Sequence, residues 1–262
     1  MEFLNDLRVK TFGDVDQVKD FDGVVEGFMI GTFPDLFKKV IDDVAESEII
    51  IVEVGSYKGL SAVTMADICK SKSLNFKIVC VDTWLGSPEH IEYLDQSQQT
   101  LYKTFLKNVK SMSHDDVIYP FPISSTQAAQ YLKNKKVIAD IIYIDAGHEY
   151  EAVKGDIEMY WDVLKPGGTM IFDDYGWDGV KKAVDEFLEG GKFGVSVVNY
   201  TGYQMYVKKA LPGQMHLVIE RSSRYQDISN TSINKIKAPE GTLCCQFGPY
   251  HLNIPDHTIM RI

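Results

Sequence analysis

From about residue 33 to residue 207 the sequence alternates between short β-branched runs and longer segments with helical periodicity. The run 49–54 (IIIVEV) is apolar at five of its six positions, and the run 138–144 (IADIIYI) is similar. Strands that are apolar on both faces are typical of a parallel sheet covered by helices. Repeated strand–helix units of this kind predict an α/β fold with an open, doubly wound, mostly parallel sheet.

The expected elements follow one another with short connections. Helices are expected at 34–46, 60–69, 97–109, 126–132, 150–164 and 180–188, and strands at 49–54, 77–81, 117–119, 138–144, 169–172, 194–198 and 203–207. The last two strands are joined by only four residues, so the chain must turn back and this pair is antiparallel. The prediction is a Rossmann-like, seven-stranded, mostly parallel sheet that ends in an antiparallel hairpin.

Three regions are expected. Residues 1–32 form an N-terminal segment that contributes to a lid over the cofactor and substrate, and residues 33–211 form the main domain. Residues 212–262 contain scattered apolar runs and turn residues but no convincing helix. They are interpreted as a small β-containing C-terminal extension, with dimerisation or a lid as the two roles left open. A homodimer is therefore one expectation for the assembly.

Charge and composition exclude several classes of partner. The chain has 262 residues, with 27 Lys and Arg against 37 Asp and Glu, so its net charge is −10. This balance argues against binding to nucleic acid or to anionic membranes, which attract basic surfaces. No apolar stretch approaches ~20 residues and no signal peptide is visible at the N-terminus. Four cysteines form no C-x-x-C pair, which favours reduced thiols in a cytoplasmic protein. These are Cys69, Cys80, Cys244 and Cys245.

Acidic residues stand where the predicted strands end. Glu53 closes the first strand, Asp82 the second and Asp145 the fourth, while Asp173 and Asp174 follow the fifth. In open α/β sheets, ligands bind outside the carboxyl ends of the strands. The sequence therefore predicts an acidic ligand site at this edge of the sheet.

The turn after the first strand carries two glycines. Gly55 and Gly59 leave room for a ligand to approach the backbone, although a tight strand–helix turn alone explains them equally well. The spacing is G-x-x-x-G, which excludes a P-loop and disfavours an ordinary dinucleotide fingerprint. Asp82 could accept the hydroxyl hydrogens of a ribose. Trp84 could lie against an adenine ring, with core packing as the alternative.

Three aspartates suggest a metal site. Asp173 and Asp174 would repel each other unless a cation lies between them, and Asp145 supplies a third carboxylate. Three oxygen ligands suit Mg²⁺ or a similar divalent cation. The alternative is that one aspartate caps a helix while another faces solvent. His148 could remove a proton from a substrate hydroxyl, or could be a structural histidine; His90 is a weaker candidate for substrate contact.

At these residues the sequence resembles a known family. The stretch 53–61 (EVGSYKGLS) is similar to motif I of class I S-adenosylmethionine-dependent methyltransferases. The segments 144–150 (IDAGHEY), 164–168 (LKPGG) and 173–175 (DDY) resemble the metal-dependent small-molecule O-methyltransferases of antibiotic-sugar and coumarin tailoring. A more distant resemblance is to the catechol O-methyltransferase type. The resemblance covers roughly residues 25–210.

The resemblance implies a role for each matching residue. It places the cofactor S-adenosylmethionine against Thr32, Glu53, Gly55, Ser56, Tyr57, Gly59, Asp82, Thr83, Trp84, Ser125 and Asp145. Within this set, Glu53 and Gly55 match positions beside the methionine part, Asp82 the ribose, and Trp84 and Ser125 the adenine. It also implies a divalent metal held by Asp145, Asp173 and Asp174, with His148 near the position of the catalytic base. In the catechol enzymes the base is a lysine and the third ligand an asparagine, so this chain departs from that pattern.

The expected function is S-adenosylmethionine-dependent methylation of a hydroxyl on a small molecule or glycan, with Mg²⁺ or a similar cation and with Asp145 and His148 as catalytic residues. One alternative is a metal-independent N-methyltransferase. Another is a fold relative that binds the cofactor without methyl transfer, such as a hydroxylase-like protein or a non-catalytic subunit. The segment 86–110, with Tyr93, Tyr102 and Phe105, is expected to form part of the acceptor wall.

Overall fold

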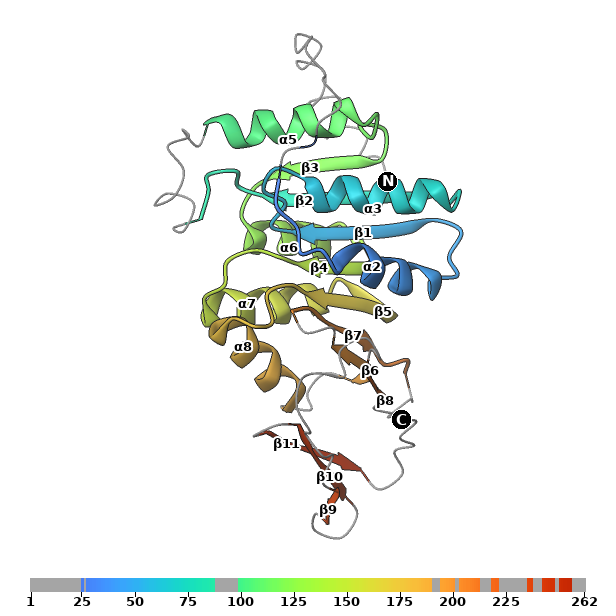
Figure 1. The fold of residues 1–262 in the computed structure, drawn as a ribbon, viewed down its shortest axis with the longest axis vertical. Helices are drawn as coiled ribbons and strands as arrows, with labels where there is room; N and C mark the ends of the chain where they lie inside the picture. Colours follow the sequence, from blue (N-terminus) through green and yellow to red (C-terminus); the bar gives the residue numbers. More distant parts are fainter. Residues whose placement is uncertain are drawn as a thin grey trace.

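The computed structural model describes residues 25, 27–87, 99–189, 194–200, 203–212, 218–221, 235–237, 242–247 and 250–255. A central sheet runs through the molecule (Figure 1). Its strands are β1 (Ile49–Val54), β2 (Phe76–Asp82), β3 (Ile118–Pro122), β4 (Ala139–Ile144), β5 (Leu164–Phe172), β6 (Val195–Tyr200), β7 (Met205–Lys209) and β8 (Val218–Arg221). They lie in the order β3-β2-β1-β4-β5-β7-β6-β8.

The strand directions match the sequence prediction. Strands β3, β2, β1, β4 and β5 are parallel, and β7 lies antiparallel between β5 and β6. Each predicted strand matches one of β1–β7 and the antiparallel β6–β7 pair is confirmed, but the sheet has eight strands rather than the predicted seven and does not end at that pair. An eighth strand, β8, comes from the C-terminal extension and pairs parallel with β6.

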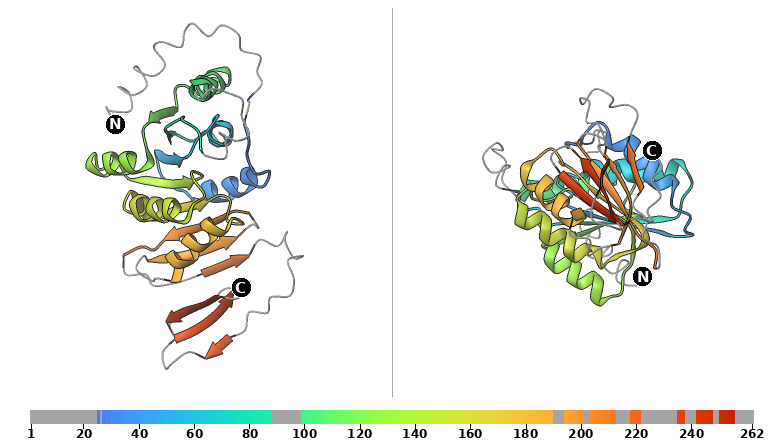
Figure 2. Two further views of the ribbon diagram at one scale, coloured as in Figure 1. Left: turned by 90° about the vertical axis from the view of Figure 1, so that its left-hand side faces the viewer. Right: turned by 90° about the horizontal axis from the view of Figure 1, so that it is seen from below.

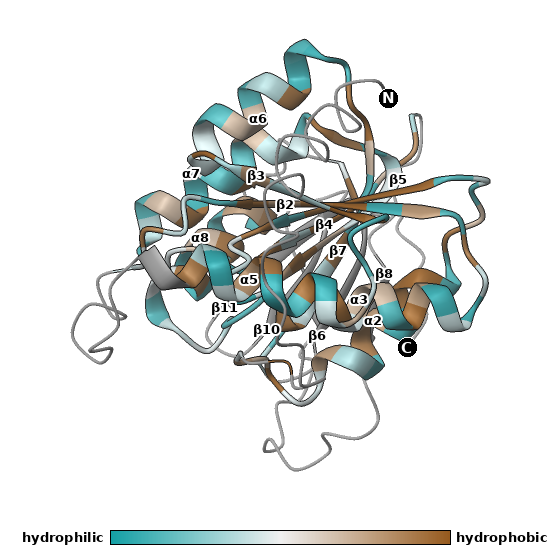
Figure 3. Cartoon of the chain, turned by 90° about the horizontal axis from the view of Figure 1, so that it is seen from above, coloured by the Kyte–Doolittle hydropathy of each residue, from teal (hydrophilic) through white to brown (hydrophobic). Residues whose placement is uncertain are grey.

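Helices cover both faces of the sheet in two layers (Figure 3). One layer holds α2 (Phe33–Asp42), α3 (Leu60–Ser71) and α5 (Gln99–Ser111). The other holds α6 (Ser125–Asn134), α7 (Tyr150–Trp161) and α8 (Asp178–Glu189). Each layer packs its apolar residues against its own side of the sheet, which gives two separate hydrophobic cores. Burial of strands on both faces explains why β1 and β4 are almost wholly apolar.

The backbone that follows β1 lies very close to the backbone that follows β4. Gly55 has a φ of +87°, and a Cβ atom there would lie 2.0 Å from the carbonyl oxygen of Asp145. Only glycine fits such an approach without displacing the backbone. Gly59 has a φ of +83° and precedes α3, and a Cβ atom there would lie 2.8 Å from the Phe105 ring. Both glycines are therefore required by the turn itself.

The C-terminal extension adds a small second sheet. Strands β9 (Lys235–Lys237), β10 (Thr242–Phe247) and β11 (Tyr250–Pro255) are antiparallel in the order β11-β10-β9 (Figure 2). One apolar run of this extension, 242–247, is thus a strand, and another, 258–262, lies outside the described residues. None of the described helices has the length and apolar character needed to cross a membrane.

Candidate active site

The parallel pairing of β2, β1, β4 and β5 brings their carboxyl ends to one edge of the sheet. Val54 pairs with Val81 and Ile144, and Ile144 pairs with Phe172. All the acids singled out from the sequence lie next to these positions, one directly before Val54 and the others just after the other three. They are Glu53, Asp82, Asp145, Asp173 and Asp174.

Asp82 is bound by the turn that follows β1. Its Oδ2 atom accepts the backbone N–H groups of Ser56 and Tyr57 at 3.0 and 2.8 Å. Its Oδ1 atom accepts the N–H of Trp84 at 2.6 Å. Tyr57 and Trp84 both have positive φ angles, +44° and +51°. The Asp82 carboxylate therefore holds two strained turns together, and three of its roughly four acceptor positions are taken, which leaves one on the Oδ1 atom.

Trp84 belongs to the hydrophobic core. Its indole is 3% exposed, and its ring centroid lies 4.7 Å from that of Tyr102 and 4.8 Å from that of Phe105. The indole N–H donates to the carbonyl of Tyr57 at 2.7 Å. The core-packing alternative describes Trp84 in this structure, because the indole presents no exposed face to an adenine ring. Phe105 is likewise fully buried and serves packing rather than an acceptor wall. Tyr102 is only partly buried beside Trp84, and its place in that wall stays a prediction. Tyr93 and His90 lie outside the described residues.

Glu53 is fully buried at the end of β1. Its Oε1 atom accepts the hydroxyl of Ser61 at 2.5 Å. Burial raises the pKa of the Glu53 carboxyl to about 7, and the nearby charge of Asp82 acts in the same direction. Near neutral pH this side chain is therefore poised between its charged and neutral forms.

The remaining predicted cofactor residues lie around the same edge. Thr32 immediately precedes α2, and its hydroxyl donates to the Oε1 atom of Gln204 at 3.1 Å. Ser125 begins α6, and its carbonyl accepts the hydroxyl of Tyr160 at 3.0 Å. Thr83 follows β2 and is exposed. Thr32 is thus tied to β7 through Gln204, and Ser125 to α7.

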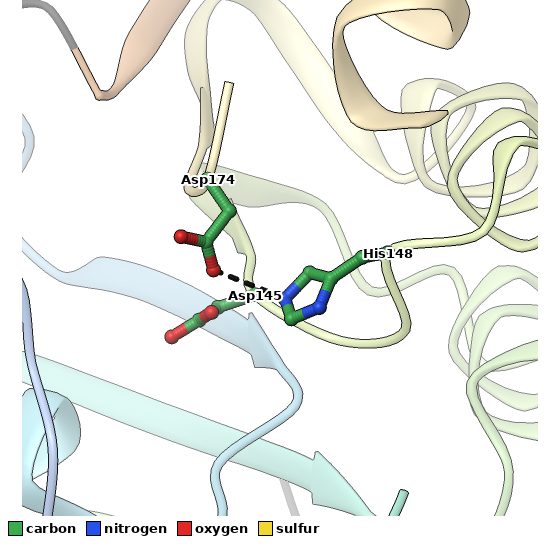
Figure 4. A group of neighbouring side chains, drawn as sticks. All are labelled: Asp145, His148 and Asp174. Atoms are coloured by element: carbon green, nitrogen blue, oxygen red, sulfur yellow. Dashed lines mark ion pairs between the residues drawn. The ribbon is translucent and has the colours of Figure 1, made fainter. Parts of the chain in front are cut away.

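Three side chains converge beyond β4 and β5 (Figure 4). Asp145, His148 and Asp174 each offer one ligand atom, and these atoms lie within 4.8 Å of one another. The Nε2 atom of His148 lies 3.0 Å from the Oδ2 atom of Asp174. We call these three residues the acid–histidine cluster. Two carboxylate oxygens and an imidazole nitrogen form a donor set that fits a divalent cation.

Asp173 does not join this cluster. Its side chain is buried, its Oδ2 atom accepts the hydroxyl of Tyr143, and its Oδ1 atom accepts the N–H of Asp174 at 3.0 Å. Burial raises the pKa of the Asp173 carboxyl to about 6. The predicted set of three aspartates is thus corrected: His148 converges with Asp145 and Asp174, while Asp173 lies behind them. The reason is that neighbouring residues at a strand end direct their side chains to different sides.

Tyr143 is a site residue that the sequence reasoning missed. It is fully buried on β4, and its hydroxyl lies 3.2 Å from the Oδ2 atom of Asp145 as well as bonding Asp173. Its ring stacks on Phe33, with centroids 4.5 Å apart. One signal could have found it, because residues two apart on a strand face the same side and Tyr143 stands two before Asp145.

The acids crowd one another. The pKa of Asp145 is raised well above its usual range, first by burial and then by the charges of Asp173, Asp174 and Glu53. Carboxylates held this close cannot all ionise easily unless a positive charge joins them. Such a carboxyl either keeps a proton or pairs with a cation, so the cluster has the donor atoms for a cation and gains electrostatically from binding one.

Comparison with known proteins gives a consistent result. Residues 52–175 match the family model described as a methyltransferase domain. A curated uncharacterised protein, R132 of Acanthamoeba polyphaga mimivirus, is 26% identical over 196 residues, which is 73% of this chain and 80% of that protein.

Among solved structures, an O-methyltransferase from Bacillus cereus in complex with SAH is similar with a TM-score of 0.50 at 17% identity, over 80% of this chain and 91% of that one. A structure assigned as an rRNA methylase from Clostridium thermocellum has a TM-score of 0.51 at 15% identity, over 72% of this chain and 99% of that one. At these identities the likeness concerns the fold. It does not choose between small-molecule and RNA acceptors.

Proposed function

We propose that this chain, whose residues 52–175 form a class I S-adenosylmethionine-dependent methyltransferase domain, methylates a hydroxyl of a small molecule or glycan with the help of a divalent metal. The observation that carries the proposal is the convergence of Asp145, His148 and Asp174 directly beside the glycine-bounded turn. The methyl donor and the acceptor oxygen must meet within a few ångströms. The glycine-bounded turn, which would bind the cofactor, packs against the acid–histidine cluster, which would bind the cation, so donor and acceptor would lie close together.

The proposed cofactor site lies between the turn after β1 and the ends of β2 and β3. Asp82 accepts a ribose hydroxyl with the remaining lone pair of its Oδ1 atom, while Glu53 and the turn 55–59 lie beside the methionine part. Thr32 and Ser125 flank this region from α2 and α6. The sulfonium of the cofactor is a cation, so the surrounding carboxylates favour its binding. That positive charge is lost on transfer of the methyl group.

The proposed metal site is the acid–histidine cluster. Asp145, His148 and Asp174 would hold the ion, which when bound lowers the pKa of an acceptor hydroxyl and orients it. Tyr143 and Asp173 support the cluster from behind, since Tyr143 reaches both Asp145 and Asp173. The reaction is an in-line displacement, so the task of these residues is to hold the acceptor oxygen ~3 Å from the methyl carbon.

His148 changes role relative to the sequence prediction. It was expected to take the proton from the acceptor hydroxyl. Its Nε2 atom, however, faces Asp174, and one nitrogen of its ring lies within ligand reach of both Asp145 and Asp174. We therefore propose ligation for His148, with the role of base as the competing assignment.

The acceptor is proposed to be a small molecule or glycan rather than nucleic acid or a membrane surface. The net charge of −10 and the five acids at this edge of the sheet oppose binding of a phosphate backbone. Two alternatives compete with this proposal: metal-independent transfer to an amine, and cofactor binding without turnover. Chelation of the metal tests the first, and product analysis tests the second.

The test combines binding with turnover. The purified chain is treated with EDTA, then titrated with S-adenosylmethionine by calorimetry and with Mn²⁺ by electron paramagnetic resonance. Methyl transfer to sugars, catechols and amines is followed by mass spectrometry with and without added Mg²⁺. We expect Mn²⁺ binding, and methylated hydroxyl products only with metal. Indifference to chelation would contradict the metal, and absent cofactor binding would contradict the whole proposal.

A variant separates the two roles of His148. His148→Ala should weaken Mn²⁺ binding by about tenfold or more if the imidazole is a ligand. Asp178→Asn, at an exposed acid in the first turn of α8, serves as the control and should bind Mn²⁺ normally. Unchanged Mn²⁺ affinity in His148→Ala, together with lost turnover, would assign His148 as the base instead.

A further inference from the structure

Gln204 is a buried amide that lies behind the acid–histidine cluster. Its side chain has no exposed surface. Phe172 pairs with Met205 in the antiparallel ladder of β5 and β7, so the next residues along the two strands, Asp173 and Gln204, stand opposite each other. Burial raises the pKa of the Asp173 carboxyl, and hydrogen bonding from Gln204 acts in the opposite direction. Gln204 is therefore a hydrogen-bond donor to Asp173 from the segment before β7.

The direction of the Gln204 amide is set by Thr32. The Thr32 hydroxyl donates to the Oε1 atom of Gln204 at 3.1 Å. A side-chain amide carries its oxygen and its nitrogen on opposite sides, so this bond turns the N–H₂ group away from Thr32 and toward Asp173. The next residue along the chain, Phe33, stacks on the ring of Tyr143 at 4.5 Å between centroids. The start of α2 thus supports both side chains, Gln204 and Tyr143, that donate to Asp173.

Asp173 in turn holds the backbone of Asp174. Its Oδ1 atom accepts the Asp174 N–H at 3.0 Å, while the Tyr143 hydroxyl donates to its Oδ2 atom. Asp174 has a φ of +50°, and a conformation of this cost persists only where the surroundings fix it. In this conformation the Asp174 carboxylate reaches the Nε2 atom of His148 at 3.0 Å. The buried carboxylate of Asp173 is therefore the anchor of the strained residue that faces the cluster.

We propose that Gln204 and Thr32 are positioning residues for the divalent metal: they keep Asp173 in its buried place, and Asp173 keeps Asp174 directed at the ion. The inference rests on the proposed function, which supplies the metal. A buried acceptor that loses one of its donors bears the cost of its lost hydration. Without Gln204 the Asp173 carboxylate gains by turning toward water, and the turn releases the N–H of Asp174. The metal then loses a correctly placed ligand, although all three side chains of the cluster are still present.

The test measures Mn²⁺ affinity of the whole chain by electron paramagnetic resonance. Gln204→Met keeps the length of the side chain and removes its polar atoms, and Thr32→Val removes only the hydroxyl. The matched control for the second change is Thr64→Val. Thr64 is also half-buried, and its hydroxyl donates to the Leu60 carbonyl within α3 at 2.8 Å. Calorimetry with S-adenosylhomocysteine shows whether each variant keeps its fold.

Partners behind a metal ligand change metal affinity about 10–100-fold, so Gln204→Met should weaken Mn²⁺ binding about tenfold. Thr32→Val should weaken it about threefold, because one neutral hydrogen bond is lost, and Thr64→Val should leave it unchanged. Gln204→Met should bind S-adenosylhomocysteine as the unaltered chain does. A loss of cofactor binding in Gln204→Met would mean that Gln204 supports the whole fold, which would overturn the inference.

A second cycle separates positioning from general support of the structure. If Gln204 acts by directing Asp174, its loss should matter little once Asp174 is no longer a charged ligand. Gln204→Met is therefore expected to change the Mn²⁺ affinity of an Asp174→Asn chain less than about twofold. The same tenfold loss in both backgrounds would overturn the inference.

The outcome also keeps the two proposals apart. Equal Mn²⁺ affinity in Gln204→Met and the unaltered chain refutes only the positioning role of Gln204. Absent Mn²⁺ binding by the unaltered chain refutes the metal of the proposed function, and the positioning role with it.

Discussion

The Nε2 atom of His148 lies 3.0 Å from the Oδ2 atom of Asp174, and both side chains are about one-quarter exposed. This pair joins the loop after β4 to the end of β5. Asp174 has a φ of +50°, a backbone conformation that is costly for a residue with a side chain. Such a conformation beside His148 fits a site that is built for a ligand rather than for stability alone.

Neutralising either acid of the cluster should weaken metal binding. Asp145→Asn and Asp174→Asn each replace a charged oxygen donor by a neutral one of the same shape. We expect each to lower the Mn²⁺ affinity by about tenfold or more, which corresponds to ~1.4 kcal/mol. Electron paramagnetic resonance of the bound ion measures the change. Affinities equal to that of Asp178→Asn would show that these carboxylates do not hold the ion.

Removal of the Asp82 carboxylate should impair the cofactor site. Hydrogen bonds to a charged acceptor each contribute ~1.5–3 kcal/mol, and Asp82 accepts three from the backbone of the two turns. Asp82→Ala should therefore lower the affinity for S-adenosylhomocysteine roughly 100-fold, by calorimetry. Asp82→Asn keeps one acceptor oxygen and should lose less. Equal affinity in all three forms would mean that Asp82 only shapes the core.

Substitution of Gly55 should disturb the contact between β1 and β4. A Cβ atom there would overlap the carbonyl oxygen of Asp145, and the φ of +87° adds strain. Gly55→Ala should lower the free energy of unfolding by ~3 kcal/mol or more and reduce cofactor binding. Gly155→Ala is the matched control, because it lies within α7 and its added methyl group would meet only Met159 at 4.0 Å. It should stabilise the chain by ~0.5–1 kcal/mol in urea unfolding.

If Gly55→Ala unfolds at the same urea concentration as the unaltered chain, the close approach of the two strand ends is relaxed in solution. Unfolding of Gly155→Ala at a lower urea concentration would contradict the assignment of that position to an unstrained helix.

Asp156 should make the stability of the fold depend on pH. Burial on α7 raises the pKa of this carboxyl to about 6, well above its value of ~3.9 in an unfolded chain. Between about pH 4 and pH 6 the folded chain keeps a proton that the unfolded chain has lost, so stability falls as the pH rises through this window. Asp156→Asn does not titrate.

The difference in unfolding free energy between Asp156→Asn and the unaltered chain should therefore shift in favour of the variant by ~2 kcal/mol between pH 4 and pH 7. Urea unfolding at a series of pH values measures it. Other acids with raised pKa values titrate equally in both chains and cancel in the difference. A difference that stays flat across this range would contradict the raised pKa.

The sequence predicted the sheet well because burial on both faces leaves a direct pattern. The run at 49–54 is a strand with the same limits, since every residue of β1 is buried. The start of β5 was missed. It begins at Leu164 rather than at 169, because Leu164 pairs with Ala139 across an irregularity in register. Pro166 and Gly167 indicate a turn, and only the neighbouring strand reveals the pairing.

At the site, the sequence could not predict the direction in which each side chain points. The sequence located the acids at the strand ends, yet it could not decide which of Asp173 and Asp174 faces the ligand. Tyr143 decides this, because its hydroxyl holds Asp173 inward. Trp84 shows the same limit, since its position after β2 suits either an adenine or the core until Tyr102 and Phe105 are placed around it.

The parallel pairing of β8 with β6 has a consequence for how copies of the chain behave toward one another. A sheet that stopped at β6 would present a row of unsatisfied N–H and C=O groups, which recruit strands from other molecules. Residues 218–221 pair with Val197–Tyr200 of that row and leave a shorter edge of four residues in its place. Truncation before β8 would therefore promote self-association and loss of solubility, even where the methyl-transfer machinery itself is left intact.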